Sequence, residues 1–307
     1  MSGRPLPLLL AVGLDLVAGE PPDRWHPVAW IGAVLASAER LSPERTVGCG
    51  GAALLAVTAA VWAGAAIVEG LARRLGWAGV VLEAVALKPA FAVRRLATAA
   101  TEVQGSLAAG RLDTARRAVA WHLVSRDTAG LGAGAVASAA VESVAENLTD
   151  SVAGPLLAYA LGGLPAAWGY RALNTADAMW GYRDARYERF GKAAARLDDA
   201  ANFVPARLAA GAIVLGALAV GEDAAAAARL AWSHHARTAS PNAGWPMAAM
   251  AGALGVGLVK PGAYRLGDRP LPGSPAAIAR AVRVFAAASG VVIGVMLAVT
   301  LRGGRRA

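Results

Sequence analysis

The sequence predicts an all-α fold, a polytopic integral membrane helical bundle with a re-entrant or broken helix and long polar helical loops. Hydrophobic residues make up 56% of the 307 residues, and the mean hydropathy is +0.46. Charged residues make up only 17%, against roughly 25% in an ordinary soluble domain. No run alternates apolar and polar residues as a half-buried strand would. This apolar excess indicates side chains that face lipid.

Four apolar runs are expected to form an uncleaved N-terminal membrane segment and three spans: Pro5–Gly19, Val47–Val68, Phe203–Val220 and Val284–Leu301. Asp15 interrupts the first run, and no clean signal-peptide cleavage site follows it. Val47–Val68 is the clearest span, because this run carries no charge. No linker rich in Ser or Pro divides the chain, so residues 1–307 are expected to form one membrane-embedded domain with polar loops at 20–46, 94–150 and 171–202.

Three further apolar runs are ambiguous. Trp77–Val93 carries Glu83 and Lys88, so it is either a doubtful span or a helix packed within the bundle. Ser151–Trp168 is broken by Pro and Gly, which is tolerated at membrane depth when the backbone is buried in protein or lines a cavity. Ala243–Val259 is short and rich in Gly, and its place stays open.

The formal charge of +9 comes almost wholly from arginine, since only Lys88, Lys192 and Lys260 are lysines. Basic residues lie in loops between apolar runs, which favours attraction to anionic lipid over nucleic-acid binding. Cys49 is the single cysteine, so no disulfide framework or thiolate metal site forms within one chain. The histidines show no metal-ligand spacing.

Polar residues gather just after the first apolar run. Asp15, Glu20 and His26 stand there among Pro21, Pro22 and Pro27, and the prolines hold the backbone extended. His26 is a candidate proton shuttle at the membrane interface. The alternative is a rigid loop that ends a helix.

A second group has carboxylates at helical spacing. Glu142, Glu146 and Asp150 are four residues apart, so a helix would place them on one acidic face. Such a face needs a cation, an arginine partner or water. Asn147 lies within this group, and Arg126 precedes it. The alternative is a solvated helix face.

The third group lies in the most charged stretch of the chain. Asp198, Asp199 and Asn202 offer hard oxygen ligands of the kind that Mg²⁺ prefers. Arginine, tyrosine and asparagine side chains suited to phosphate and carboxylate recognition accompany them: Asn174, Tyr182, Arg183, Arg186 and Arg196. Asp177 is a further carboxylate of this stretch. The alternative is a basic cytoplasmic loop of a transporter.

A fourth group is the turn Ser240-Pro241-Asn242-Ala243-Gly244-Trp245-Pro246. It signals only a turn when taken alone. No Walker A loop, G-x-S-x-G elbow, H-E-x-x-H helix or G-x-G-x-x-G turn occurs in the sequence.

Together these groups resemble the adenosylcobinamide-phosphate synthase family of cobalamin biosynthesis, known as CobD or CbiB. The matching strings are DLVAGEPPDRWHPV, SRDTAGL, AAVESVAENLTDSVAGPL, ALNTADAMWGYRDARYERFGKAAARLDDAANFVPARL and SPNAGWPMAAMAGALG. They occur in order over about residues 10 to 265. Glu20 stands where the family pattern leads us to expect Asp, so a carboxylate is kept.

The resemblance implies a membrane-bound ligase that joins the propionate carboxylate of adenosylcobyric acid to aminopropanol or its O-phosphate. It implies ATP and Mg²⁺, a corrinoid substrate, membrane lipid and further enzymes of cobalamin biosynthesis as partners. Side-chain chemistry at the matching positions gives the expected roles. The expected catalytic residues are His26, Glu142, Glu146, Asp150 and Asp177, and the expected metal ligands are Asp198, Asp199 and Asn202. Substrate and phosphate binding are expected from Arg126, Asn147, Asn174, Tyr182, Arg183, Arg186, Arg196 and Asn242.

For these motifs to share one site, Trp77–Val93 must cross the membrane and Ser151–Trp168 must enter and return on one side. The excess of arginine on the motif side then predicts a multi-pass protein of the cell (inner) membrane with a cytoplasmic active site. Two other classes compete. A transporter or non-catalytic corrinoid scaffold remains open, although no internal repeat is present. A CDP-alcohol phosphotransferase fits less well, because Ala185 stands where a Gly is expected after Asp184.

Overall fold

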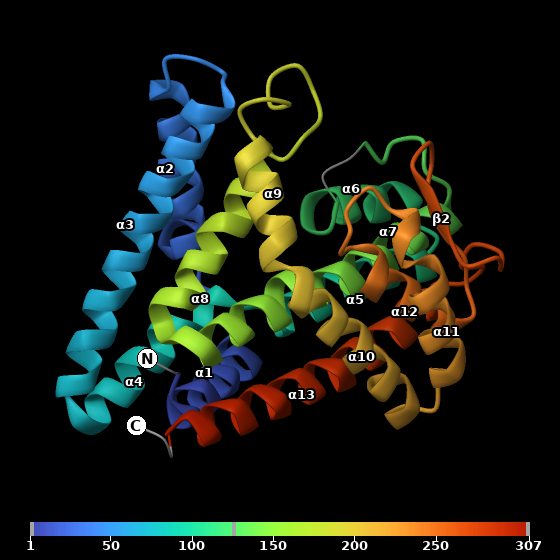
Figure 1. The fold of residues 1–307 in the computed structure, drawn as a ribbon. Coiled ribbons are helices and arrows are strands. Elements are labelled where there is room, and N and C mark those ends of the chain that lie inside the picture. Colours follow the sequence, from blue (N-terminus) through green and yellow to red (C-terminus); the bar gives the residue numbers. More distant parts are fainter. Residues whose placement is uncertain (1–2, 125–126, 305–307) are drawn as a thin grey trace. The chain divides into compact units, whose positions relative to one another are not determined.

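The computed structural model describes residues 3–124 and 127–304, and the described chain is mostly helical, with almost no sheet (Figure 1). Its contacts divide it into two compact units built from interleaved segments. Unit 1 comprises residues 1–92, 154–202 and 295–307, and unit 2 comprises residues 93–153 and 203–294. The helical class is confirmed, and the expectation that one domain covers the whole chain stays a prediction.

Unit 1 contains α1 (Pro5–Ala18), η1 (Asp23–Trp25), α2 (Pro27–Leu41), α3 (Val47–Arg74), α4 (Gly76–Leu87), η2 (Lys88–Ala90), α8 (Gly154–Trp180) and α9 (Lys192–Ala201). The long helix α3 packs along α8 and α4, and α2 and α9 pack against both α3 and α8. Helix α1 packs on α4. These contacts bring the N-terminal motif and the charged stretch around α9 into one unit.

Unit 2 contains α5 (Arg94–Ala108), α6 (Leu112–His122), α7 (Ala133–Leu148), η3 (Thr149–Ala153), α10 (Phe203–Ala219), α11 (Ala224–His234), η4 (His235–Arg237), α12 (Gly244–Leu254), β1 (Leu258–Lys260) and β2 (Tyr264–Leu266). The final helix α13 (Ala276–Gly304) begins in this unit. Helix α12 is almost wholly buried, and most of α7 is buried too. The antiparallel β1–β2 hairpin was not expected from the sequence, and its three paired positions on each strand are too few to produce an alternating pattern.

Three described helices are long and apolar enough to cross a membrane: Val47–Arg74, Gly76–Ala108 and Ala276–Gly303. The expected spans at Val47–Val68 and Val284–Leu301 fall within the first and third. The ambiguous run at Trp77–Val93 falls within the second, which combines α4, η2 and α5. Helix α10 meets the same criteria only together with α9, and α1 is shorter than a full span.

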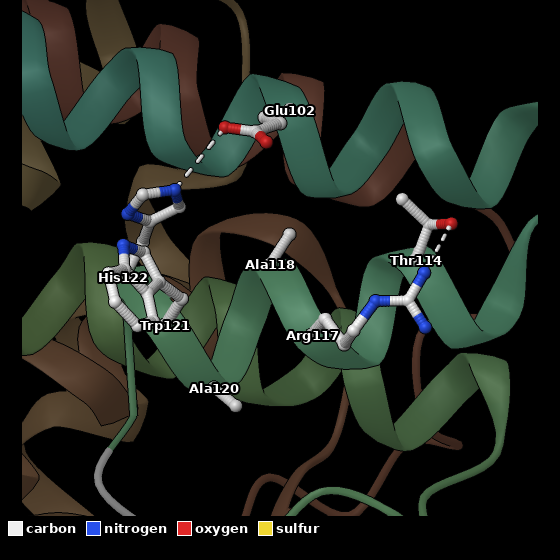
Figure 2. Close-up of a pocket in the computed structure, with 7 residues that line it drawn as sticks. All are labelled: Glu102, Thr114, Arg117, Ala118, Ala120, Trp121 and His122. Carbon is white, nitrogen blue, oxygen red and sulfur yellow. Dashed lines mark hydrogen bonds and ion pairs between the residues drawn. The ribbon is translucent and has the colours of Figure 1, made fainter.

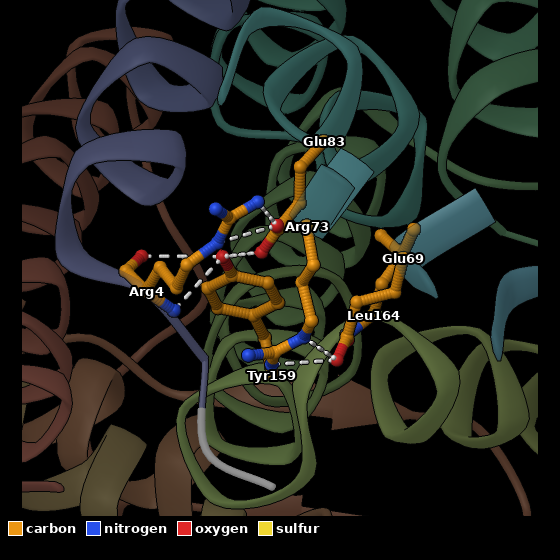
Figure 3. Close-up of polar contacts among 6 residues, drawn as sticks. All are labelled: Arg4, Glu69, Arg73, Glu83, Tyr159 and Leu164. Carbon is orange, nitrogen blue, oxygen red and sulfur yellow. Dashed lines mark hydrogen bonds and ion pairs between the residues drawn. The ribbon is translucent and has the colours of Figure 1, made fainter. Parts of the chain in front are cut away.

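The charged residues that made Trp77–Val93 ambiguous are buried inside unit 1. Glu83 is fully buried, and it accepts hydrogen bonds from the Arg4 guanidinium and the Tyr159 hydroxyl (Figure 3). Lys88 is also buried and pairs with carboxylates. Charges inside apolar segments normally face partners in the protein interior rather than lipid. As predicted, the side chains of Glu83 and Lys88 face the protein interior, here the interior of unit 1.

The expected break in the apolar run after Ser151 occurs in α8, at Gly163 and Pro165. Gly163 has φ +71° and ψ −161°, outside the helical region, and Pro165 follows two residues later. The break leaves the backbone N–H of Leu164 without a helical acceptor, and the Glu69 carboxylate accepts it at 2.7 Å (Figure 3). A Cβ at Gly163 would lie 2.2 Å from Glu69 Oε2, so both the backbone angle and the close approach require glycine. The broken helix is therefore confirmed, and its re-entrant path stays a prediction.

Candidate active site

A buried polar network in unit 1 joins α8 to α9. Asp198 and Asn202 are both buried, and Asn202 Nδ2 donates to Asp198 Oδ2 at 2.9 Å. Asn174 of α8 reaches the other oxygen, Asp198 Oδ1, at 3.4 Å. The hydroxyl of Tyr170 donates to Asn202 Oδ1 at 2.6 Å. The predicted pair Asp198 and Asn202 therefore shares one face, together with Asn174, and Tyr170 is an additional member that the sequence did not single out.

The same contacts limit how these residues fit Mg²⁺. The Asn202 oxygen accepts from Tyr170, so its amide turns N–H groups rather than oxygen towards Asp198. Asp199 is half-buried next to Asp198 on the helix. Among the described residues, no group of three His, Cys, Asp or Glu side chains lies close enough together to hold a metal ion. Mg²⁺ at these carboxylates would need further oxygen ligands from water or a bound anion.

The charged loop between α8 and α9 carries the expected phosphate-binding residues. Tyr182 and Arg183 are exposed in this loop, and Arg196 is exposed on α9. Arg186 is engaged already, because its Nε and Nη2 donate to Glu39 Oε1 of α2 at 2.9 and 2.7 Å. Arg45 donates to the same oxygen at 2.8 Å. Arg183 and Arg196 are therefore exposed guanidinium groups of the charged loop and α9, whereas the exposed Arg186 is paired with Glu39.

The N-terminal motif forms an ionic chain with η2. Lys88 Nζ lies 3.2 Å from Asp15 Oδ1 and 2.6 Å from Glu20 Oε1. Glu20 Oε2 in turn lies 2.9 Å from His26 Nε2. Burial opposes ionisation of Glu20, but the hydrogen bonds from His26 and Lys88 outweigh it and lower the pKa of this carboxyl. The sequence predicted that Lys88 faces the interior, but it did not predict that Lys88 pairs with the carboxylates of the N-terminal motif.

His26 uses both ring nitrogens within this motif. Its Nδ1 accepts from the backbone N–H of Val28 at 3.2 Å, so the imidazole caps the first turn of α2. Its Nε2 contacts Glu20. This geometry favours the capping role that the sequence left open beside the proton shuttle.

The acidic group on α7 is only partly aligned. Glu142 and Glu146 lie one helical turn apart, but α7 ends at Leu148 and Asp150 lies in the π-helical turn η3. Ideal α-helical spacing therefore does not extend to Asp150. Glu142 is buried and accepts from Ser138 at 2.7 Å and from Tyr264 at 2.9 Å. Glu146 and Asp150 are half-buried, so both are more accessible than Glu142.

The remaining predicted residues divide between the two units. Asn147 bonds within α7 and η3, to Ser143 and Ser151. Asp177 is half-buried on α8. Asn242 is buried in unit 2, where its Oδ1 accepts from Arg207 at 3.1 Å. Arg126 lies outside the described residues. The expectation that all motifs share one site stays a prediction, because His26, Asp177 and Asp198 belong to unit 1 while Glu146 and Asn242 belong to unit 2.

A surface depression of about 570 Å³ lies on α5 and α6 of unit 2 (Figure 2). Trp121 and His122 lie at one end of it, and Arg117 lies at the other. His122 Nε2 is 3.5 Å from Glu102, and Arg95 contacts its Nδ1 at 2.9 Å. Burial and the Arg95 charge lower the pKa of this histidine. None of the predicted site residues lines the depression.

Comparison with known proteins identifies relatives over most of the chain. The "Probable cobalamin biosynthesis protein CobD" of Methanothermobacter thermautotrophicus is 41% identical, over 85% of this chain and 86% of that protein. The "Cobalamin biosynthesis protein CobD" of Geobacter metallireducens is 42% identical over 82% and 80% of the two chains, and that of Klebsiella pneumoniae is 39% identical over 82% and 81%. No solved structure matches. The family model described as CobD/Cbib protein matches residues 8–285, so this chain belongs to the CobD/Cbib family.

Proposed function

We propose that this protein acts in cobalamin biosynthesis as an ATP-dependent amide ligase. It joins the propionate carboxylate of adenosylcobyric acid to aminopropanol or its O-phosphate, giving adenosylcobinamide or its phosphate. Membership of the CobD/Cbib family over residues 8–285 carries this proposal. The names of the relatives support the pathway, and the chemistry of the polar groups supports the reaction class.

Amide formation from a free carboxylate is uphill in water, so the carboxylate needs activation. The simplest route transfers the γ-phosphoryl group of ATP to the propionate oxygen, releasing ADP. The amine nitrogen then attacks the acyl carbon, loses a proton to a base and displaces inorganic phosphate. Mg²⁺ would neutralise phosphate charge during the first step.

The described residues supply matching groups. Asp198, positioned by Asn174 and Asn202, is the carboxylate best held for a metal–phosphate contact. Exposed Arg183 and Arg196 are the guanidinium groups for phosphate oxygens. Glu146 is the proposed base for the amine proton, because its side chain is half-buried whereas that of Glu142 is buried.

The proposed location is the cell (inner) membrane, with the motifs on the cytoplasmic side where ATP is present. The three candidate spans agree with a membrane protein. Membrane lipid and other enzymes of the pathway are the proposed partners.

The test is an assay with purified protein in detergent. Adenosylcobyric acid, ATP and Mg²⁺ are supplied with either aminopropanol or its O-phosphate, and the corrinoid product is identified by its mass. The proposal expects a product heavier by one amine minus water, and comparison of the two amines identifies the substrate. A scaffold or transporter would form no product alone.

A further inference from the structure

Arg207 of α10 lies against two aromatic rings in unit 2. Its guanidinium carbon lies 3.6 Å from the ring centre of Phe203 and 5.0 Å from that of Trp245. His235 stacks on Trp245, with ring centres 4.0 Å apart and planes inclined by 19°. Stacking on flat rings restrains the plane of a guanidinium group and adds cation–π attraction.

One edge of this guanidinium is fixed, and the other is available. Nη1 donates to the Phe203 carbonyl at 2.6 Å and to Asn242 Oδ1 at 3.1 Å. Within the described residues, Nε and Nη2 of Arg207 have no hydrogen-bond acceptor and no carboxylate partner, and neither atom is sealed from solvent. Asn242 is itself buried, so its contact holds the arginine from inside the unit.

This arrangement suits an oxyanion. The Nε and Nη2 edge of arginine donates two parallel hydrogen bonds to carboxylate or phosphate oxygens. The side chain is half-buried, so its charge is partly removed from water, and no carboxylate of residues 3–124 or 127–304 pairs with it. The rings and Asn242 already restrict its rotamers, which reduces the entropy lost when an anion binds.

We propose that Arg207 binds an oxyanion of a substrate through Nε and Nη2, and that Asn242 positions it. The ligand is a phosphate or carboxylate group, and the inference rests on the proposed function for the identity of the substrates. The sequence predicts substrate contact for Asn242, and here Asn242 acts through Arg207.

The experiment measures equilibrium binding to purified full-length protein without turnover. The probes are inorganic phosphate, ATP, aminopropanol O-phosphate, free aminopropanol and adenosylcobyric acid, each titrated separately. The variants are Arg207→Gln, which removes the charge, and Arg207→Lys, which keeps the charge but not the two-pronged edge. Arg229→Gln is the matched control, because it removes one exposed arginine from the same unit.

Arg207→Gln is expected to weaken at least one oxyanion probe by about 10-fold or more, with Arg207→Lys in between. Arg229→Gln should leave that constant unchanged. Weaker binding of aminopropanol O-phosphate but not free aminopropanol identifies the amine phosphate, weaker ATP binding identifies the nucleotide, and weaker adenosylcobyric acid binding identifies the propionate. If Arg207→Gln does not fold, Arg207→Lys decides by the same comparison.

Dissociation constants that Arg207→Gln leaves unchanged for every probe would overturn the inference. An equal loss of affinity in Arg229→Gln would overturn it too. A loss confined to binding of phosphatidylglycerol vesicles, relative to phosphatidylcholine vesicles, would show that Arg207 attracts anionic lipid headgroups and would also overturn it. If Arg207 binds an oxyanion but the protein forms no amide, the anion site is supported and the proposed reaction is contradicted.

Discussion

The carboxylate of Asp198 accepts a hydrogen bond at 2.9 Å from the side chain of Asn202, one helical turn further along the chain. This contact crosses the end of α9, and Tyr170 of α8 fixes the far side of Asn202. Burying a carboxylate lowers the stability of the fold unless hydrogen bonds fully satisfy its oxygens. A buried carboxylate that is retained is therefore a candidate for a functional role.

Asp198→Asn tests whether this carboxylate takes part in the reaction. The change preserves size, so folding should persist, while loss of the charge should lower kcat by about 100-fold or more if Asp198 contacts the metal–phosphate. Activity is measured at limiting and saturating Mg²⁺, with Glu44→Gln as the control, because Glu44 is an exposed carboxylate of the same unit outside the predicted site. Near-normal kcat at limiting Mg²⁺ would exclude the role.

Gly163→Ala tests the break in α8. The substitution forces a side chain into φ +71° and places its Cβ against Glu69, so it should cost about 1–3 kcal/mol and lower Tm. Gly70→Ala is the control, because Gly70 lies within α3 with open space around its Cβ position. That control should be neutral or slightly stabilising. Equal Tm values for the two variants would show that the break carries no strain.

Lys88→Met tests the ionic chain of the N-terminal motif. Removing the ammonium leaves Asp15 and Glu20 without their shared cation and should cost about 3–5 kcal/mol at neutral pH. Lys260→Met is the control, since Lys260 is exposed.

The pH dependence of the same variant has a definite sign. The pKa of Glu20 is lower in the folded protein than its ordinary value of 4.5. Ionised Glu20 therefore stabilises the wild-type fold at pH values above 4.5, and this contribution is lost as the pH falls through the lowered pKa. The deficit of Lys88→Met in urea unfolding should therefore be largest near neutral pH and shrink below pH 4.5. A deficit that grows on acidification would contradict the assigned ion pairs.

His26→Gln separates capping from catalysis. Both imidazole nitrogens are occupied, so kcat should stay near the wild-type value while stability falls by about 1 kcal/mol through weaker capping of α2. The measurements are the pH profile of kcat and thermal unfolding. Loss of one limb of the pH profile, with Tm unchanged, would restore the proton-shuttle hypothesis.

Labelling of single cysteines tests the predicted topology. In a Cys49→Ala background, cysteines replace Arg24, Gly130 and Asp184, which are exposed, whereas Glu142 is too buried for labelling. All three should label from the cytoplasm, and Arg74→Cys should label from the opposite side. Labelling of any of the three only from the periplasm would refute a single cytoplasmic site.

Sequence patterns predicted the helical class, the spans within Val47–Arg74 and Ala276–Gly303, and the break near Gly163, because these depend on local composition and backbone chemistry. The run at Trp77–Val93 stayed ambiguous, and Phe203–Val220 is long enough for a span only together with α9. The shared face of Asp198 and Asn202 followed from their spacing of four residues. Contacts distant in sequence were not predictable. Lys88 with Glu20, Arg186 with Glu39 and Glu142 with Tyr264 depend on tertiary packing. The π-helical turn at Asp150 was also not predicted, because one extra residue in a turn leaves no periodic signal in the sequence.

The central claim is that the purified chain alone couples ATP consumption to amide formation. The most direct measurement is the ratio of corrinoid amide formed to ADP released, in nanodiscs that contain only this protein. The account predicts a ratio near one, dependence of ADP release on both adenosylcobyric acid and the amine, and loss of both products in Asp198→Asn. Corrinoid that remains unaltered while the protein is folded and binds its substrates would contradict it.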